Sequence, residues 1–232
     1  YQLQAEIEHE FQMSGANGPA YTSIVGSGAN GCILHYIENK EKLKNGDLVL
    51  IDAGCEFADY ASDITRTFPV NGKFSNEQAA IYDIVLKALK EAIDVTQAGI
   101  PYNKTNETTI RVITEGLVEL GLLKGDINDL IKAEAHREFY MHGAGHWLGL
   151  DVHDVGDYKI DGEWRIYEPG MVVTIEPGIY ISPKNRRVDT KWRGIGVRIE
   201  DDIVITKTGN INLTSKVPKE RNEIEKMMEK KN

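Results

Sequence analysis

Acidic residues at the ends of apolar, strand-like runs are the first candidates for chemistry in this chain. In residues 46–68, GDLVLIDAGCEFADYASDITRTF, Asp52 ends one apolar run and Asp63 begins the next. The two runs predict a β-hairpin, and alternation along each strand would let both carboxylates point into the same space. Two carboxylates held together away from water are unstable unless a cation lies between them. The spacing therefore predicts a cation site, although a single strand-end aspartate can equally cap a turn.

The same pattern occurs again in the second half of the chain. The segment GMVVTIEPG matches the earlier segment GDLVLIDAG in both glycines, in the isoleucine before the acid and in having an acid there, so that Glu176 stands where Asp52 stands. Glu200, in the segment GVRIEDDIVI, supplies the second acid of this half, as Asp63 does in the first. This internal duplication predicts four carboxylates around one site, which roughly two divalent cations would neutralise.

Histidines gather in the segment MHGAGHWLGLDVHD, residues 141–154. His142 and His146 are four residues apart, but the glycines around them favour a loop or an irregular strand over a helix. The zinc-binding helix pattern H-E-x-x-H, which also needs a glutamate after the first histidine, is therefore excluded. Together with His153, these residues predict one wall of an active site. His35, in the segment CILHY, could by itself be a buried, hydrogen-bonded structural histidine.

Four carboxylates and one imidazole, from His146 or a neighbouring histidine, form a hard to borderline ligand set. Such a set suits Mn²⁺, Co²⁺, Fe²⁺ or Zn²⁺, and its richness in carboxylates favours Mn²⁺. Two such ions can share a bridging water, lower its pKa and polarise a carbonyl group. A nearby carboxylate would then move the proton, and a free histidine would stabilise the oxyanion. The residues thus predict metal-assisted hydrolysis.

Five motifs together resemble those of the creatinase/aminopeptidase family of metallopeptidases, which have the "pita-bread" fold. They are IDAG, SDITRTFPV, HGAGHWLGLDVHD, TIEPGIY and GVRIEDD, and the resemblance extends over about residues 20–215. It implies an α+β fold in which a curved antiparallel sheet with an internal duplication, with helices outside it, holds two metals. Within the family the motifs are most similar to those of Xaa-Pro aminopeptidases. That similarity implies release of the N-terminal residue from peptides with proline at the second position.

The resemblance also implies roles for individual residues. It assigns five side chains to the metals: Asp52 and Asp63 to one ion, and His146, Glu176 and Glu200 to the other, with Asp63 and Glu200 bridging. Glu176 would in addition carry the proton. Substrate-side histidines and residues that support the metals complete the implied site: His35, His142, His153, Arg198 and Tyr180.

Other members of the family and of the fold are alternatives. Prolidases cleave only dipeptides that end in proline. The motif HGAGHWLGLDVHD favours the aminopeptidase, but chain-length preference also depends on what blocks the cleft. Methionine aminopeptidases fit the extra histidines and the segment GVRIEDD poorly. A catalytically inactive member that binds peptides or proteins, or a metal-free creatinase-like hydrolase, would lack metal ligands, whereas all five positions here carry competent residues.

Length and composition limit the kinds of partner and the cellular location that we expect for the protein. The chain has 232 residues, enough for a sizeable core, and a net charge of −9 without a Lys/Arg-rich run, which argues against nucleic acid as a partner. No apolar run is long enough to cross a membrane. Cys32 and Cys55 do not form a C-x-x-C pair, so we expect reduced thiols and a cytoplasmic location. The resemblance implies a peptide substrate and a homo-oligomer, either a dimer or a tetramer.

We expect one catalytic domain over residues 1–232, because no linker divides the chain and the duplicated strands interlock. Residues 1–14 predict a helix without an N-cap, and we expect the N-terminal domain of the family to precede it. Ser75 with Gln78 forms a capping-box pattern that opens a helix, and residues 79–98 carry its amphipathic face. Further elements are expected as follows: a strand at 21–25, a strand or extended turn at 32–36, helices at 105–122 and 126–135, a basic surface loop at 184–194 that includes Arg186 and Arg187, a strand at 196–205, and a peripheral charged helix at 218–232.

Overall fold

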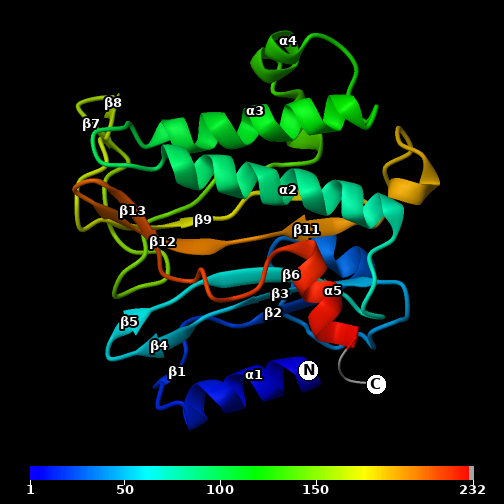
Figure 1. Ribbon diagram of the computed structural model, residues 1–232, viewed down its shortest axis with the longest axis horizontal. Helices are drawn as coiled ribbons and strands as arrows, with labels where there is room; N and C mark the ends of the chain where they lie inside the picture. Colours follow the sequence, from blue (N-terminus) through cyan, green and yellow to red (C-terminus); the bar gives the residue numbers. More distant parts are fainter. Residues whose placement is uncertain (230–232) are drawn as a thin grey trace.

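Antiparallel sheets with helices outside them make up the fold that the computed structural model describes for residues 1–229 (Figure 1). Helices α2 (Asn76–Val95) and α3 (Asn103–Glu119) lie side by side across one side of the strands, and α1 (Gln2–Met13) lies on the opposite side (Figure 1). This arrangement confirms the predicted α+β class. Among the described helices, none combines the length and the apolar character needed to cross a membrane.

The first half of the chain builds a three-stranded antiparallel sheet. Its central strand β3 (Leu48–Ala53) pairs with β2 (Ile24–Ser27) on one side and with β6 (Ile64–Pro69) on the other. The register places Asp52 directly opposite Thr65, so these two side chains point to the same face. Because side chains alternate, the aspartate two residues before Thr65 points to that face too, as the hairpin pattern predicts.

Gly54 lies where the two arms of the hairpin approach each other too closely for a side chain. The three short strands β1 (Gly18–Pro19), β4 (Cys55–Phe57) and β5 (Tyr60–Ala61) form a small sheet beyond β3. A Cβ atom at Gly54 would lie 1.7 Å from the carbonyl oxygen of Ser62, so a side chain there would push the two arms apart. The glycine of the IDAG motif therefore lets the acids approach each other. The remaining short elements are β7 (Lys159–Ile160), β8 (Glu163–Trp164) and three 3₁₀ turns, Gly28–Cys32, Ala135–Glu138 and Thr190–Trp192.

The second half repeats the antiparallel pairing. Strand β12 (Asp201–Thr206) lies between β9 (Val172–Ile175) and β13 (Gly209–Asn212). A separate pair, β10 (Gly178–Tyr180) and β11 (Gly196–Arg198), continues the same two chain segments beyond a break.

The prediction of a single strand at 196–205 is therefore wrong, because the structure has two strands in this segment. Ile199 and Glu200 separate β11 from β12, and they lie opposite Glu176 and Pro177 in the partner segment. Proline has no N–H to donate to a ladder, so the pairing is interrupted on both segments. The interruption frees both glutamates from regular strand pairing at the centre of the molecule.

The loop between α1 and β3 also differs from expectation. Strand β2 begins at Ile24 rather than at residue 21, because Ile24 already pairs with Asp52, next to the end of β3. Little of β3 remains for residues 21–23 to pair with. Residues 33–36 follow a 3₁₀ helix, and Leu34 and His35 lie in a turn, which is one of the two forms expected there.

Helices α1, α2 and α3 begin and end within three residues of the positions expected from the sequence. The side chain of Ser75 accepts the N–H of Gln78, and Oε1 of Gln78 accepts the N–H of Ser75, which confirms the predicted capping box. The expected helix at 126–135 is a shorter helix followed by a 3₁₀ turn. The C-terminal helix buries Ile224 but otherwise has exposed or half-buried side chains over its described residues, as expected of a peripheral helix, and residues 230–232 lie outside the described part of the chain. The two short helices are α4 (Ile127–Lys132) and α5 (Arg221–Glu229).

The main core lies between the two long helices and the second sheet. Helix α2 presents Ile81, Val85 and Leu89 on its inner face, all fully buried, as its 3.6-residue periodicity predicts. They belong to one cluster with Ile175 of β9 and Ile203 of β12. This packing holds the two strands that end next to Glu176 and Glu200.

Candidate metal centre

Asp52 and Asp63 meet where the β3–β6 ladder ends. Both side chains are buried and line a cavity of 480 Å³ to which both halves of the chain contribute. The hydroxyl group of Tyr21 lies within hydrogen-bonding distance of both carboxylates, 2.6 Å from Oδ1 of Asp52. The sequence does not single out Tyr21, because it lies in a loop where no periodicity fixes the direction of a side chain.

Glu200 reaches the same cavity from the break between β11 and β12. Its side chain is buried, and its Oε2 accepts a hydrogen bond from the hydroxyl group of Thr65 at 2.6 Å. Its backbone N–H donates to the carbonyl oxygen of Thr65 at 3.0 Å. The two halves of the chain are thus joined directly beside the acids.

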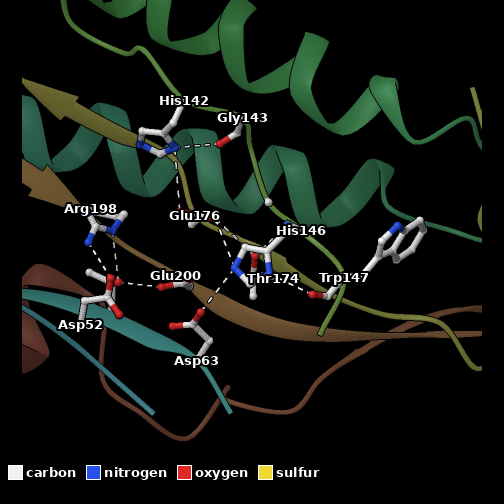
Figure 2. A network of polar contacts seen from close by, with 12 residues as sticks. Asp52, Asp63, His142, Gly143, His146, Trp147, Thr174, Glu176, Arg198 and Glu200 are labelled. Carbon is white, nitrogen blue, oxygen red and sulfur yellow. Dashed lines mark hydrogen bonds and ion pairs between the residues drawn. The ribbon is translucent and has the colours of Figure 1, made fainter. Parts of the chain in front are cut away.

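Glu176 and His146 complete the acidic cluster (Figure 2). Nε2 of His146 lies 3.4 Å from Oδ2 of Asp63 and 3.7 Å from Oε1 of Glu176. Nδ1 of His146 lies 2.9 Å from the carbonyl oxygen of Trp147. A carbonyl oxygen only accepts, so Nδ1 carries the proton of the neutral ring, and the Nε2 lone pair faces the acids. Such a nitrogen can bind a metal ion.

Glycine brings the segment that carries His146 against β9. A Cβ atom at Gly145 would lie 1.8 Å from the carbonyl oxygen of Thr174, so no other residue fits there. Thr174 donates its N–H to the carbonyl oxygen of His146 at 2.9 Å, and Glu176 donates its N–H to Ala144 at 2.8 Å. The hydroxyl oxygen of Thr174 accepts the N–H of His146 at 3.1 Å and lies 3.4 Å from Oε1 of Glu176. This loop is irregular, as its glycines predict, and it fixes the imidazole beside the carboxylates.

Burial and mutual repulsion shift the pKa values of these groups. Burial raises the pKa of Glu176 to about 7, because the charge of His146 offsets only part of the effect. Burial, followed by the charges of Asp63 and Glu176, raises the pKa of Glu200 well above its usual range. Burial lowers the pKa of His146, but the neighbouring Asp63 and Glu176 outweigh it and raise this pKa to about 8. Like charges are therefore crowded at the site.

The donor set fits a divalent metal ion. Asp63, His146 and Glu200 each offer a ligand atom, and these atoms all lie within 4.8 Å of one another. Among the residues that line the cavity, Arg198 is the one lysine or arginine facing four carboxylates. A divalent cation would relieve the repulsion that raises the pKa values of the acids.

A chain of hydrogen bonds runs from Asp52 to the loop before His146. Arg198 donates from Nη2 to Oδ2 of Asp52 at 2.6 Å and from Nη1 to the hydroxyl oxygen of Tyr180 at 3.0 Å. A guanidinium only donates, so the phenolic proton of Tyr180 points at Nε2 of His142, 2.8 Å away. Nδ1 of His142 then donates to the carbonyl oxygen of Gly143 at 2.8 Å. Burial and the charge of Arg198 lower the pKa of His142 to about 4, so this ring is neutral.

His35 and His153 line other parts of the cavity wall. Both are exposed, so the interpretation of His35 as a buried structural histidine is wrong. The ring of His153 packs edge-on against that of His146, with 4.4 Å between their centroids. Both ring nitrogens of His142 are engaged, whereas His35 and His153 present exposed rings to a ligand in the cavity.

The structure brings the sequence-predicted residues together. Nine of them line one cavity, and Tyr180 lies behind it in contact with Arg198. Arg186 and Arg187 are exposed on the surface outside the site, and Arg187 pairs with Glu138 at 3.2 Å. The nine residues are Asp52, Asp63, His146, Glu176, Glu200, Arg198, His35, His142 and His153.

Three supporting residues were not singled out from the sequence: Thr65, Thr174 and Asp202. Oδ2 of Asp202 accepts the backbone N–H of Asp63 at 3.1 Å. Each of the three stands two positions from an acid of the site, which is a signal that strand alternation could have supplied.

Comparison with known proteins agrees with this site. The model of metallopeptidase family M24 matches residues 1–207. The chain therefore belongs to this family of metallopeptidases.

Curated relatives of the chain include Xaa-Pro aminopeptidases. The chain is 58% identical to the Escherichia coli K12 Xaa-Pro aminopeptidase over 228 residues, which cover 98% of this chain and 51% of the relative. It is 40% identical to human Xaa-Pro aminopeptidase 3 over 225 residues, 97% of this chain and 44% of the relative. The chain thus spans about half the length of the curated relatives it matches.

Solved structures confirm the predicted fold class. Pseudomonas aeruginosa aminopeptidase PepP matches 99% of this chain and 52% of its own, with 60% identity and a TM-score of 0.98. Proline aminopeptidase P II from Yersinia pestis covers the same shares with 58% identity and a TM-score of 0.96. A variant of Escherichia coli aminopeptidase P in complex with substrate covers them with 56% identity and a TM-score of 0.96.

Proposed function

We propose that this chain carries the catalytic site of a metal-dependent Xaa-Pro aminopeptidase, which releases the N-terminal residue from peptides with proline second. The proposal rests on one observation above all. Four carboxylates and an imidazole from both halves of the chain converge on one cavity. Membership of the metallopeptidase family and 58% identity to the Escherichia coli enzyme support the substrate class.

The proposal includes two divalent metal ions. Mn²⁺ is favoured over Co²⁺, Fe²⁺ and Zn²⁺, because carboxylates dominate the ligand set. When bound, the ions supply Lewis-acid activation of a water molecule and of the peptide carbonyl group. The proposed ligands are Asp52 and Asp63 for one ion and His146, Glu176 and Glu200 for the other, with Asp63 and Glu200 bridging.

Glu176 is the proposed proton carrier. A general base must lie within reach of the proton that it abstracts, and Glu176 lines the cavity beside His146. Its carboxylate takes the proton of the attacking water and returns it to the proline nitrogen as the peptide bond breaks. Oε1 lies beside the hydroxyl group of Thr174, which limits the orientations of the carboxylate.

The histidines are proposed to hold the substrate. His35 and His153 have exposed rings and would contact the proline segment and stabilise the charge that develops on the carbonyl oxygen. His142 is a neutral wall of the cavity, held by Tyr180 and Gly143. Arg198 holds Asp52 in place and moderates the local negative charge.

The setting of this site is also proposed. A cytoplasmic location agrees with the free thiols of Cys32 and Cys55. A single catalytic domain over residues 1–232, a preceding N-terminal domain and assembly as a dimer or tetramer stay predictions. Light scattering on the full-length protein tests the assembly.

Substrate comparison tests the proposed activity. We expect the Mn²⁺-loaded protein to release alanine from Ala-Pro-Ala, to leave Ala-Ala-Ala intact, and to lose turnover in the matched variant Glu176→Gln. Cleavage of Ala-Pro but not of Ala-Pro-Ala would replace the proposal with a prolidase. Equal cleavage of both tripeptides would refute selectivity for proline, and no cleavage of any peptide by the metal-loaded protein would refute the activity.

A further inference from the structure

The two halves of the chain meet beside Asp63 and Glu200, and we call this boundary the seam. Two side-chain hydrogen bonds cross it. Thr65 stands two residues after Asp63, and its hydroxyl group donates to Oε2 of Glu200 at 2.6 Å. Asp202 stands two residues after Glu200, and its Oδ2 accepts the N–H of Asp63 at 3.1 Å. Each acid is thus held by the residue two positions beyond the other acid.

Neighbouring side chains join the two halves through other atoms: Arg66 donates to the carbonyl oxygen of Glu200 at 2.5 Å and pairs with Asp201 at 2.7 Å. Strands β6 and β12 belong to separate sheets, so no ladder of backbone hydrogen bonds fixes the distance between Asp63 and Glu200. The N–H of Glu200, which donates to the carbonyl oxygen of Thr65, is the one backbone bond here. The contacts of Thr65 and Asp202 differ from these, because they reach the carboxylate of Glu200 and the backbone N–H of Asp63.

The direction of the Thr65 contact is fixed. Nε of Arg198 lies 3.3 Å from the hydroxyl oxygen of Thr65, and a guanidinium only donates. An ionised carboxylate only accepts, so the single proton of the hydroxyl group goes to the ionised Glu200. One carboxylate oxygen of Glu200 is held in this way, which sets the direction in which the other oxygen and the remaining lone pairs point.

Asp202 is a support and not a member of the cavity wall. Its side chain is buried, it does not line the cavity, and its Oδ1 has no hydrogen-bond partner among the described residues. Its observed contribution is the acceptor for the N–H of Asp63. That contact anchors the residue at which the β5–β6 turn ends, where no strand pairing holds it.

We propose that Thr65 and Asp202 are positioning residues that set the separation and orientation of Asp63 and Glu200, and through them the affinity of the site for divalent cations. This inference rests on the proposed metal-dependent function. Groups that orient metal ligands are typically worth about 10- to 100-fold in metal affinity.

Metal binding by chelator-stripped protein tests the proposal without relying on activity. Mn²⁺ is titrated into wild-type protein, and free Mn²⁺ is followed by electron paramagnetic resonance. We expect Thr65→Val, which keeps the shape and removes the hydroxyl group, to weaken Mn²⁺ binding by about 10- to 100-fold. Thr65→Ser, which keeps the hydroxyl group, should bind within about threefold of wild type, by the same reasoning.

Asp202 is tested by the matching pair. Asp202→Ala should weaken Mn²⁺ binding as Thr65→Val does, whereas Asp202→Asn retains an acceptor oxygen and should restore most of the affinity. Thr109→Val is the control for loss of a buried hydroxyl group. Thr109 is fully buried and bonds to the carbonyl oxygen of Thr105 within α3, without contact to any acid of the site.

Each outcome has a distinct meaning. If wild type binds Mn²⁺ and folded Thr65→Val and Asp202→Ala bind it equally well, the positioning role is overturned and the proposed function stands. If Thr109→Val weakens binding as much as Thr65→Val, the effect reflects general destabilisation and the positioning role is also overturned. If wild type itself binds no divalent cation, the proposed function fails together with this inference.

Discussion

Replacing Glu176 with glutamine should remove one contribution to an unusual pH dependence of folding. Glutamine keeps the shape of the side chain and removes its titration. An ordinary glutamate has a pKa of 4.5, whereas burial raises the pKa of Glu176 to about 7 in the folded chain. The unfolded chain therefore ionises at this position at a lower pH than the folded chain does.

The sign and size of the effect follow from linkage. An acid whose pKa is raised by folding supports the fold fully below pH 4.5, and this support is lost as the pH rises through 7. Over that range the loss amounts to about 3 kcal/mol, since each pKa unit corresponds to about 1.4 kcal/mol. His142 acts in the opposite sense, because its lowered pKa of about 4 makes the fold less stable as the pH falls from 6.5. Comparison with Glu176→Gln at each pH cancels the contributions of groups that do not interact with Glu176.

Urea unfolding of chelator-treated protein at pH 5, 6, 7 and 8 measures this effect. We expect the variant to gain about 2 to 3 kcal/mol relative to wild type between pH 5 and pH 8. Saturating Mn²⁺ should remove the trend, because a metal ion favours the ionised carboxylate. A difference between variant and wild type that stays constant from pH 5 to pH 8 without metal would refute the reasoning from burial.

Four further predictions concern single side chains. Glu176→Ala should lower kcat by at least about 100-fold in a peptide-release assay, because it removes both a proposed ligand and the proton carrier; near-normal turnover would exclude that role. His142→Ala should lower kcat while metal content, measured by plasma mass spectrometry, stays constant; a fall in content would make His142 a ligand. Arg186→Ala should leave kcat/KM within about twofold, because the side chain is exposed outside the site. Ser75→Ala should lower the free energy of unfolding by about 1 kcal/mol in urea, and an unchanged value would contradict the role of the cap.

The acids of the site could be predicted because their signals are local. An acid at the end of an apolar, alternating run is unusual wherever it occurs, and the same pattern around Asp52 and Glu176 indicated a duplicated site. The start of α2 could be predicted equally well, because the capping box of Ser75 and Gln78 lies within four residues. Both features depend on residues that are close together in the sequence, so they can be predicted from the sequence alone.

Contacts between distant segments could not be predicted in the same way. Thr65 and Glu200 are 135 residues apart, and their hydrogen bond depends on how the two sheets meet. Tyr21 reaches Asp52 from a loop without periodicity, and its direction depends on where β2 begins. The direction of these side chains is a property of the assembled fold.

The break between β11 and β12 could be predicted only in part from the sequence. The sequence shows continuous strand character from Gly196 onward, and the interruption comes from Pro177 in the partner segment. Proline after the acid was visible, but its effect on the opposite strand requires the register. His35 shows the same limit, since its segment alone left a buried structural histidine open, whereas the turn exposes the ring.

The most direct test of the central claim is hydrolysis of an X-Pro-Y tripeptide by the same protein sample in three states: as Mn²⁺-loaded protein, after chelation, and after Mn²⁺ is restored. We predict release of the first residue in the first state, its loss in the second and its return in the third. Release that continues unchanged after complete removal of metal, or no release while Mn²⁺ is bound, would contradict a metal-dependent Xaa-Pro aminopeptidase.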